Sequence, residues 1–139
     1  MQAKDMNLDV FRTVIGTLRA GGCLGFAPEG VSRFLPYMEQ PFKTGVARIA
    51  LDAVRQATEE GDLAFTVNVV TCGLIFTHRE KFRSDLCMRY SSPILVNEEF
   101  RKQFGDDREA ARVLTQKVWG RLVWTNTVCS LAVEARLGC

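Results

Sequence analysis

The chain has 139 residues, of which 47% are hydrophobic and 24% charged, and its formal net charge is +2. These values are typical of one globular domain with a sizeable core, and they exclude a disordered or collagen-like chain. Because the 18 basic and 16 acidic residues form no block of like charge, the sequence gives no support to nucleic-acid binding.

Helices and strands alternate in the first half of the chain. Apolar residues at helical spacing predict a helix over about residues 8–19, and a short apolar run predicts a buried strand at Cys23–Ala27. A second helix is predicted over residues 46–60. Residues 63–76 follow, rich in β-branched and aromatic residues, and predict a long buried strand. This order is typical of an α/β unit.

The second half begins with a strand candidate at residues 85–96 that Pro93 breaks or marks as an edge. A short helix is predicted at residues 97–104, and Asp106-Asp107 can cap a longer one. The last part of the chain, residues 101–139, is expected to consist of helices. We therefore expect a single α/β domain with a partial mixed sheet flanked by helices.

Five widely spaced cysteines include no Cys-x-x-Cys pair, so they predict reduced, mostly buried thiols and no zinc site. No metal or redox cofactor is expected. The N-terminus lacks the apolar run of a signal peptide, and no stretch of about 18 uncharged apolar residues could span a bilayer. The nearest candidate, Leu122–Val133, is too short, so we expect no targeting or transmembrane segment in this chain.

The first strand leads into a Pro-Glu-Gly corner that holds Glu29 and Gly30. Open α/β sheets usually bind ligands at such strand ends, where a carboxylate can accept a hydrogen bond from a substrate hydroxyl. Ser32, Arg33 and Lys43 then offer the hydroxyl, guanidinium and ammonium groups that hold phosphates, and Lys43 directly precedes a helix N-terminus. The alternative is an ordinary solvated loop, since proline, glycine and cations are also common in turns.

A second cationic segment, THREKFRS, follows the long strand and contains His78, Lys81 and Arg83. His78 is the single histidine of the chain, and no acid stands at a spacing that would orient it as a general base. A thiol hydrolase that uses Cys72 or Cys87 with His78 is a further alternative.

Two ordered blocks carry a family resemblance. GFAPEGVSRFLPYMEQPFKTGVARIAL, residues 25–51, resembles the Phe-Pro-Glu-Gly block of the glycerophospholipid acyltransferase family, enzymes that acylate glycerol-3-phosphate, dihydroxyacetone phosphate or lysophosphatidic acid. VNVVTCGLIFTHREKFRSDLCMRYSSPILV, residues 67–96, resembles the next block of the eukaryotic glycerol-3-phosphate acyltransferase branch. The resemblance covers about residues 8–100.

The resemblance implies O-acyl transfer from acyl-CoA to a glycerol-phosphate-type acceptor in phospholipid biosynthesis. The parent protein would act at the cytosolic face of an endomembrane, the endoplasmic reticulum, and would meet the membrane surface there. Acyl-CoA would be a co-substrate, and no other cofactor is implied. Carried over by motif, the acceptor site would use Glu29, Gly30, Ser32, Arg33 and Lys43, with His78, Lys81 and Arg83 as secondary candidates.

In the family that this chain resembles, the general base is a histidine in a His-x-x-x-x-Asp motif. This sequence does not contain that motif. The chain therefore looks like the C-terminal portion of the family's domain without its N-terminal strands, and we expect it to be inactive, or nearly so, in isolation. The alternative function is a non-catalytic interaction or regulatory module, which would associate with another copy or with a full-length relative through an uncovered apolar surface.

Overall fold

The computed structural model describes residues 3–28, 42–78, 80–123 and 128–136, and for 3–8, 123 and 128–136 it describes the backbone alone. In chain order the elements are α1 (Ala3–Arg19), β1 (Cys23–Phe26), α2 (Gly45–Glu59), β2 (Thr66–Phe76), β3 (Leu86–Tyr90), β4 (Ile94–Val96), α3 (Glu98–Lys102), α4 (Asp107–Val123) and β5 (Val128–Arg136). The helices and strands predicted before residue 124 are thereby confirmed, with boundaries that shift by a few residues. The first strand was expected to be buried, but the side chains of β1 are exposed or half-buried.

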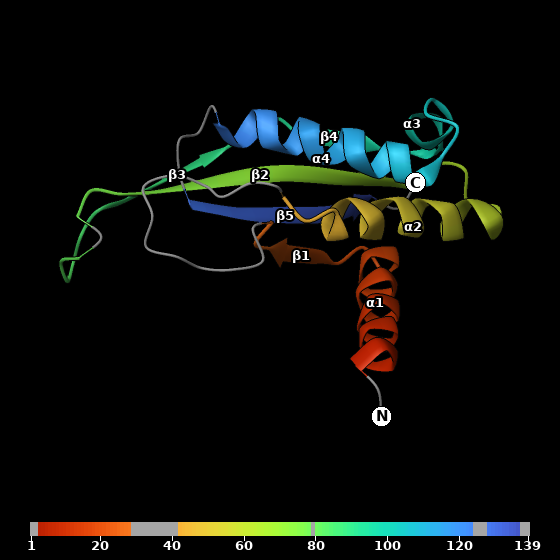
Figure 1. Ribbon diagram of the computed structural model, residues 1–139, viewed down its shortest axis with the longest axis horizontal. Coiled ribbons are helices and arrows are strands. Elements are labelled where there is room, and N and C mark those ends of the chain that lie inside the picture. The colour runs from red at the N-terminus through yellow and green to blue at the C-terminus, as the bar shows by residue number, and fades with distance from the viewer. Residues whose placement is uncertain (1–2, 29–41, 79, 124–127, 137–139) are drawn as a thin grey trace.

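The described strands form one sheet in the order β1-β5-β2-β3, and β4 also pairs with β2 (Figure 1). β5 lies between β1 and β2, so that Ala132 faces Gly25 on one side and Val70 on the other. Along its other edge, β2 pairs with β3 and then with β4. The α/β class is confirmed, and each of these four pairings is antiparallel, where a mixed sheet was expected.

Two helices, α2 and α4, run along the sheet and pack on it (Figure 1). Val67 and Val69 of β2 are fully buried in the core shared with these helices. Because side chains alternate along a strand, the odd-numbered residues of β2 face the helices and the even-numbered residues face the opposite side. The largest fully buried side chains of this core include Val54, Val96, Leu114 and Leu122.

The first helix, α1, points away from the sheet near β1 and contacts α2 (Figure 1). Its end requires glycine. Gly21 has a φ of 79°, and a Cβ atom on Gly22 would lie 2.7 Å from Cγ2 of Thr17. Arg19 forms an ion pair with Glu60 at the end of α2, so the turn between α1 and β1 is fixed on both sides.

Pro93 interrupts the strand candidate at residues 85–96, as predicted. Tyr90 lies opposite Cys72, whereas Ile94 lies opposite Val69. Three residues of this strand segment therefore face two residues of β2, which is a β-bulge. The bulge separates β3 from β4 while both stay paired with the same strand.

The C-terminal segment is where the sequence-based prediction was wrong. Residues 101–139 were expected to be helical, but after α3 and α4 the chain forms β5, which pairs with both β1 and β2. The physical reason is a period of two that outweighs the general apolar character of this segment. Cys129, Leu131, Val133 and Ala135 alternate with Ser130, Ala132, Glu134 and Arg136.

Candidate functional site

The candidate acceptor residues are carried by a segment whose two ends lie together. β1 leads to Pro28, which is buried, and the chain returns at Phe42, which is 8% exposed. The backbone N–H of Lys43 donates to the carbonyl oxygen of Pro28 at 3.2 Å, so this segment leaves and rejoins the fold at one place. Glu29, Gly30, Ser32 and Arg33 lie outside the described residues, and their roles stay predictions.

Lys43 stands immediately before the N-terminus of α2. Its side chain is exposed, and no carboxylate in the described part of the chain forms an ion pair with it. The side chain of Thr44 makes no capping hydrogen bond, and the first turn of α2 contains no acidic residue. The first backbone N–H groups of a helix have no intrahelical acceptor and favour an anion. Lys43 and these amides therefore form a site where a phosphate would be stabilised.

A small pocket lies beside Lys43 and is mostly apolar. Its cavity volume is about 10 Å³, which leaves room for roughly one water molecule. The ring of Phe42 meets Trp119 of α4 edge to face at 4.8 Å between centroids, and this contact fixes the residue next to Lys43. The pocket is therefore too small to enclose a ligand larger than about one water molecule. The lining residues are Pro28, Phe42, Lys43, Val46, Ala47, Val69, Leu114, Thr115 and Val118.

The secondary candidates His78, Lys81 and Arg83 lie in the connection between β2 and β3, far from the start of α2 in Figure 1. The structure therefore does not bring them together with Lys43. The imidazole of His78 is exposed, and its Nδ1 atom lies 3.8 Å from Oε1 of Glu80, which is exposed as well. An exposed carboxylate at this distance does not fix a histidine as a general base.

The thiols differ from their predicted burial. Among the three cysteines whose side chains are described, Cys72 is buried, whereas Cys23 and Cys87 are exposed. A Cys72-His78 dyad is disfavoured because the strand advances about 3.3 Å per residue and carries Cys72 away from the loop that holds His78. The Tyr90 hydroxyl donates to Sδ of Met88 at 4.0 Å, and the neighbouring Cys72 thiol raises the pKa of Tyr90.

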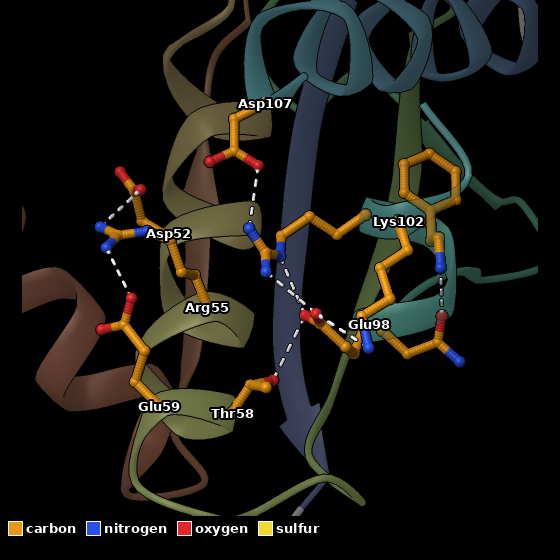
Figure 2. Close-up of polar contacts among 10 residues, drawn as sticks. Asp52, Arg55, Thr58, Glu59, Glu98, Lys102 and Asp107 are labelled. Atoms are coloured by element: carbon orange, nitrogen blue, oxygen red, sulfur yellow. Dashed lines mark hydrogen bonds and ion pairs between the residues drawn. The ribbon is translucent and has the colours of Figure 1, made fainter. Parts of the chain in front are cut away.

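A polar network around Glu98 was not found from the sequence (Figure 2). Its carboxylate accepts two hydrogen bonds from Arg101, both at 2.9 Å, and one from the hydroxyl of Thr58 at 3.3 Å. Lys102 lies 3.7 Å away, and Arg101 also reaches Asp107 at 3.3 Å. These contacts join α2, α3 and the start of α4.

The network has the properties of a structural clamp. Glu98 is only 9% exposed, and the hydrogen bonds from Arg101 are the main cause that holds the pKa of Glu98 below its usual range. The same bonds raise the pKa of Arg101. Because both oxygens of the carboxylate already accept hydrogen bonds from its own chain, this group has little acceptor capacity left for a substrate. The sequence signal is a Glu and an Arg three residues apart after the helix cap Asn97.

Among the residues that the structure describes, no three or more histidine, cysteine, aspartate or glutamate side chains are grouped as metal ligands would be. Within the same part of the chain, every helix is too short or too polar to cross a membrane.

Comparison with known proteins finds three relatives that indicate the family of the chain. It is 38% identical over 130 residues to glycerol-3-phosphate O-acyltransferase 2 of Saccharomyces cerevisiae, a match that covers 93% of the chain. It is 32% identical over 91 residues, 66% of the chain, to an uncharacterized acyltransferase of Schizosaccharomyces pombe. Glycerol-3-phosphate O-acyltransferase 1 of Saccharomyces cerevisiae is 27% identical over 87% of the chain.

The chain belongs to the glycerophospholipid acyltransferase family. The resemblance read from residues 25–51 and 67–96 is thereby confirmed. This acyltransferase-family chain spans 16%, 13% and 16% of the lengths of these three relatives, so it corresponds to a small part of each. No family model matches the chain, and no solved structure matches it.

Proposed function

We propose that this chain supplies the acceptor side of an O-acyltransferase that moves an acyl group from acyl-CoA to a glycerol-phosphate-type acceptor in phospholipid biosynthesis. The observation that carries the proposal is the 38% identity, over 93% of the chain, to a protein named glycerol-3-phosphate O-acyltransferase. The exposed Lys43 at the start of α2 supports it, since this pair of features suits a phosphate.

Each candidate residue has a role in this proposal. Lys43 and the first amides of α2 hold the acceptor phosphate, and Ser32 and Arg33 add a hydroxyl and a guanidinium. Glu29 accepts a hydrogen bond from an acceptor hydroxyl, and Gly30 lets the backbone turn beside it. The site lies at the cytosolic face of an endoplasmic reticulum membrane in this proposal.

Acyl transfer also needs a group that removes the acceptor's proton. The acceptor oxygen attacks the thioester carbonyl carbon, a base takes the hydroxyl proton, and coenzyme A leaves as the thiol. The single histidine, His78, lies in the β2–β3 connection away from Lys43. We infer that the isolated chain binds the acceptor but turns over little, because a general base contributes a factor of about 10² to 10⁴ in rate.

Acceptor binding is tested by titrating glycerol-3-phosphate into the purified chain in a calorimeter. We expect Lys43→Gln to weaken binding about tenfold, because it removes a charged hydrogen bond to phosphate. Lys117→Gln is the matched control, since Lys117 is an exposed lysine of α4 that lies over the ring of Phe100 and outside the pocket. Equal affinity of all three proteins, or no binding by any of them, contradicts the acceptor role.

Turnover is tested separately, by following acyl-CoA consumption with glycerol-3-phosphate present. The expected result is consumption close to the rate without protein. Robust turnover that disappears in a Glu29→Ala variant would overturn the inference that the isolated chain is nearly inactive. It would also require a base outside the residues considered above.

A further inference from the structure

The connection between β2 and β3 projects beyond the rest of the molecule, at the left of Figure 1. Phe82 at this connection is 93% exposed. On the adjoining strand ends four more large apolar side chains are between 40% and 63% exposed. We call these five residues the hairpin patch: Phe76, Phe82, Leu86, Met88 and Tyr90.

Strand pairing puts the four strand residues of the hairpin patch on one face. Leu86 lies opposite Phe76, Met88 opposite Leu74, and Tyr90 opposite Cys72. All three partners are even-numbered residues of β2, and directly paired residues share a face of the sheet. They therefore lie on the face opposite α2 and α4, where those helices cannot cover them.

The connection itself has a defined shape. The backbone N–H of Thr77 donates to the carbonyl of Asp85 at 3.1 Å, and that of His78 donates to the hydroxyl of Ser84 at 2.8 Å. The N–H of Lys81 closes a turn on the carbonyl of His78 at 3.0 Å. The described backbone on either side of Phe82 is thus held by hydrogen bonds, so little backbone conformational entropy is lost when this residue docks.

Charge is concentrated on the same hairpin. Four basic and two acidic residues lie between Thr77 and Tyr90, so this segment carries the net charge of +2 and the rest of the chain is balanced. Lys81 and Arg83 form no ion pair with a carboxylate of the described residues, and the Arg83 guanidinium lies 5.7 Å from the centre of the Phe82 ring. Four arginines of the helices differ, because Arg19, Arg55, Arg101 and Arg112 are each paired with carboxylates.

We propose that the β2–β3 hairpin docks on an anionic lipid surface, with Phe82 in the interfacial layer and Lys81 and Arg83 at the lipid phosphates. An apolar side chain between unpaired cations is complementary to such a surface, which offers both apolar volume and negative charge. A second copy of the chain is a poorer occupant. A two-fold contact would set the same patch on both sides, so the unpaired cations of both copies would be brought into one interface.

Vesicle sedimentation tests the proposal with the whole 139-residue chain. The probes are vesicles of phosphatidylcholine alone and vesicles of phosphatidylcholine and phosphatidylserine in equal amounts. We expect binding to the second kind only, weakened by salt. Phe82→Ser and the double variant Lys81→Gln/Arg83→Gln should each lower the affinity for these vesicles by about tenfold.

Matched controls remove the same chemical groups elsewhere. Leu63→Ser removes an apolar side chain that is 71% exposed in the turn before β2. Arg12→Gln/Arg108→Gln lowers the net charge as much as the hairpin double variant does, at exposed positions of α1 and α4. Both controls should bind vesicles as the unchanged chain does. In addition, the fluorescence that Phe82→Trp adds to the chain should be quenched by lipids brominated on their acyl chains. The fluorescence that Leu63→Trp adds should not be quenched.

Three results would overturn the proposal. They are equal binding to both kinds of vesicle, equal losses in the hairpin variants and their controls, and absence of binding by a folded chain. A dimer in light scattering that Phe82→Ser dissociates would assign the hairpin patch to contact between copies instead. Vesicle binding is measured without turnover and without an acceptor. Failure of the docking proposal and failure of the proposed acyl transfer are therefore separate results.

Discussion

Two regions at opposite ends of the molecule handle charge differently (Figure 1). Around Glu98, beside α3, a nearly buried carboxylate is satisfied by Arg101, Lys102 and Thr58 (Figure 2). At the β2–β3 hairpin, Lys81 and Arg83 have no such partner, and they flank Phe82, whose side chain is almost fully exposed. Satisfied charges hold elements of one chain together, whereas unsatisfied charges beside apolar side chains remain available to another molecule.

The comparison predicts that stability is concentrated at the helix-covered side of the sheet. Leu114→Ala should lower the free energy of unfolding by about 3 kcal/mol, because Leu114 is fully buried and its truncation leaves a cavity beside Val69 and Val118. Met88→Ala, a truncation in the hairpin patch at a side chain 48% exposed, should change it by less than about 0.5 kcal/mol. Urea unfolding measures both, and equal losses would remove the proposed difference between the regions.

A smaller effect is expected within the Glu98 network. Arg101→Gln should lower the free energy of unfolding by about 2 kcal/mol, because it leaves the nearly buried Glu98 carboxylate without its two main hydrogen bonds. Arg112→Gln is the control. It also removes an arginine–glutamate pair on a helix, but there both Arg112 and Glu109 are exposed, and we expect little change.

The pH dependence sharpens this test. The folded-state pKa of Glu98 is lowered, so its contribution to stability is fully present above the unfolded-state pKa and is lost as the pH falls through the folded-state pKa. The stability difference between the unchanged chain and Arg101→Gln should therefore be constant near neutral pH and shrink in acid. A difference that is the same throughout the acid range would assign the effect of Arg101 to packing and not to its charge.

The smallest effect is expected in the hairpin backbone. Arg83 has a φ of 64°, which is unfavourable for a residue with a side chain. Arg83→Gly relieves this strain but adds entropy to the unfolded chain, so we expect a gain in stability of less than about 1 kcal/mol. Lys81→Gly in the same hairpin has no such strain to relieve and should be neutral or slightly destabilising. A loss at Arg83 larger than at Lys81 in urea unfolding would contradict this account.

The sequence predicted most of the fold because strong local signals agree with it. Helical spacing defined α2, and the β-branched run defined β2. β5 was missed because its alternation from Cys129 to Arg136 is short and follows directly on an apolar helix end. The register of a sheet depends on contacts between distant segments, which no local pattern contains.

The candidate site was predictable to a smaller extent. Lys43 could be placed before a helix from the sequence, and the structure puts it there with an exposed side chain. The separation of Lys43 from His78 depends on the direction in which β2 extends away from α2, so it could not be read from residue spacing. The Glu98 clamp depends on Thr58, forty positions earlier in the chain, and was equally hidden.

The position of β5 also has a consequence for how the protein is made. β1 is synthesised well before its partner strand, because Cys23 is paired with Glu134, 111 positions later in the sequence. Until β5 has been synthesised, β1 and β2 have no strand between them, and the edge of β2 that β5 will occupy stays open. While the residues between β2 and β5 are being added, the nascent chain would thus expose unpaired strand edges, the kind of edge that invites wrong pairing unless a chaperone shields it.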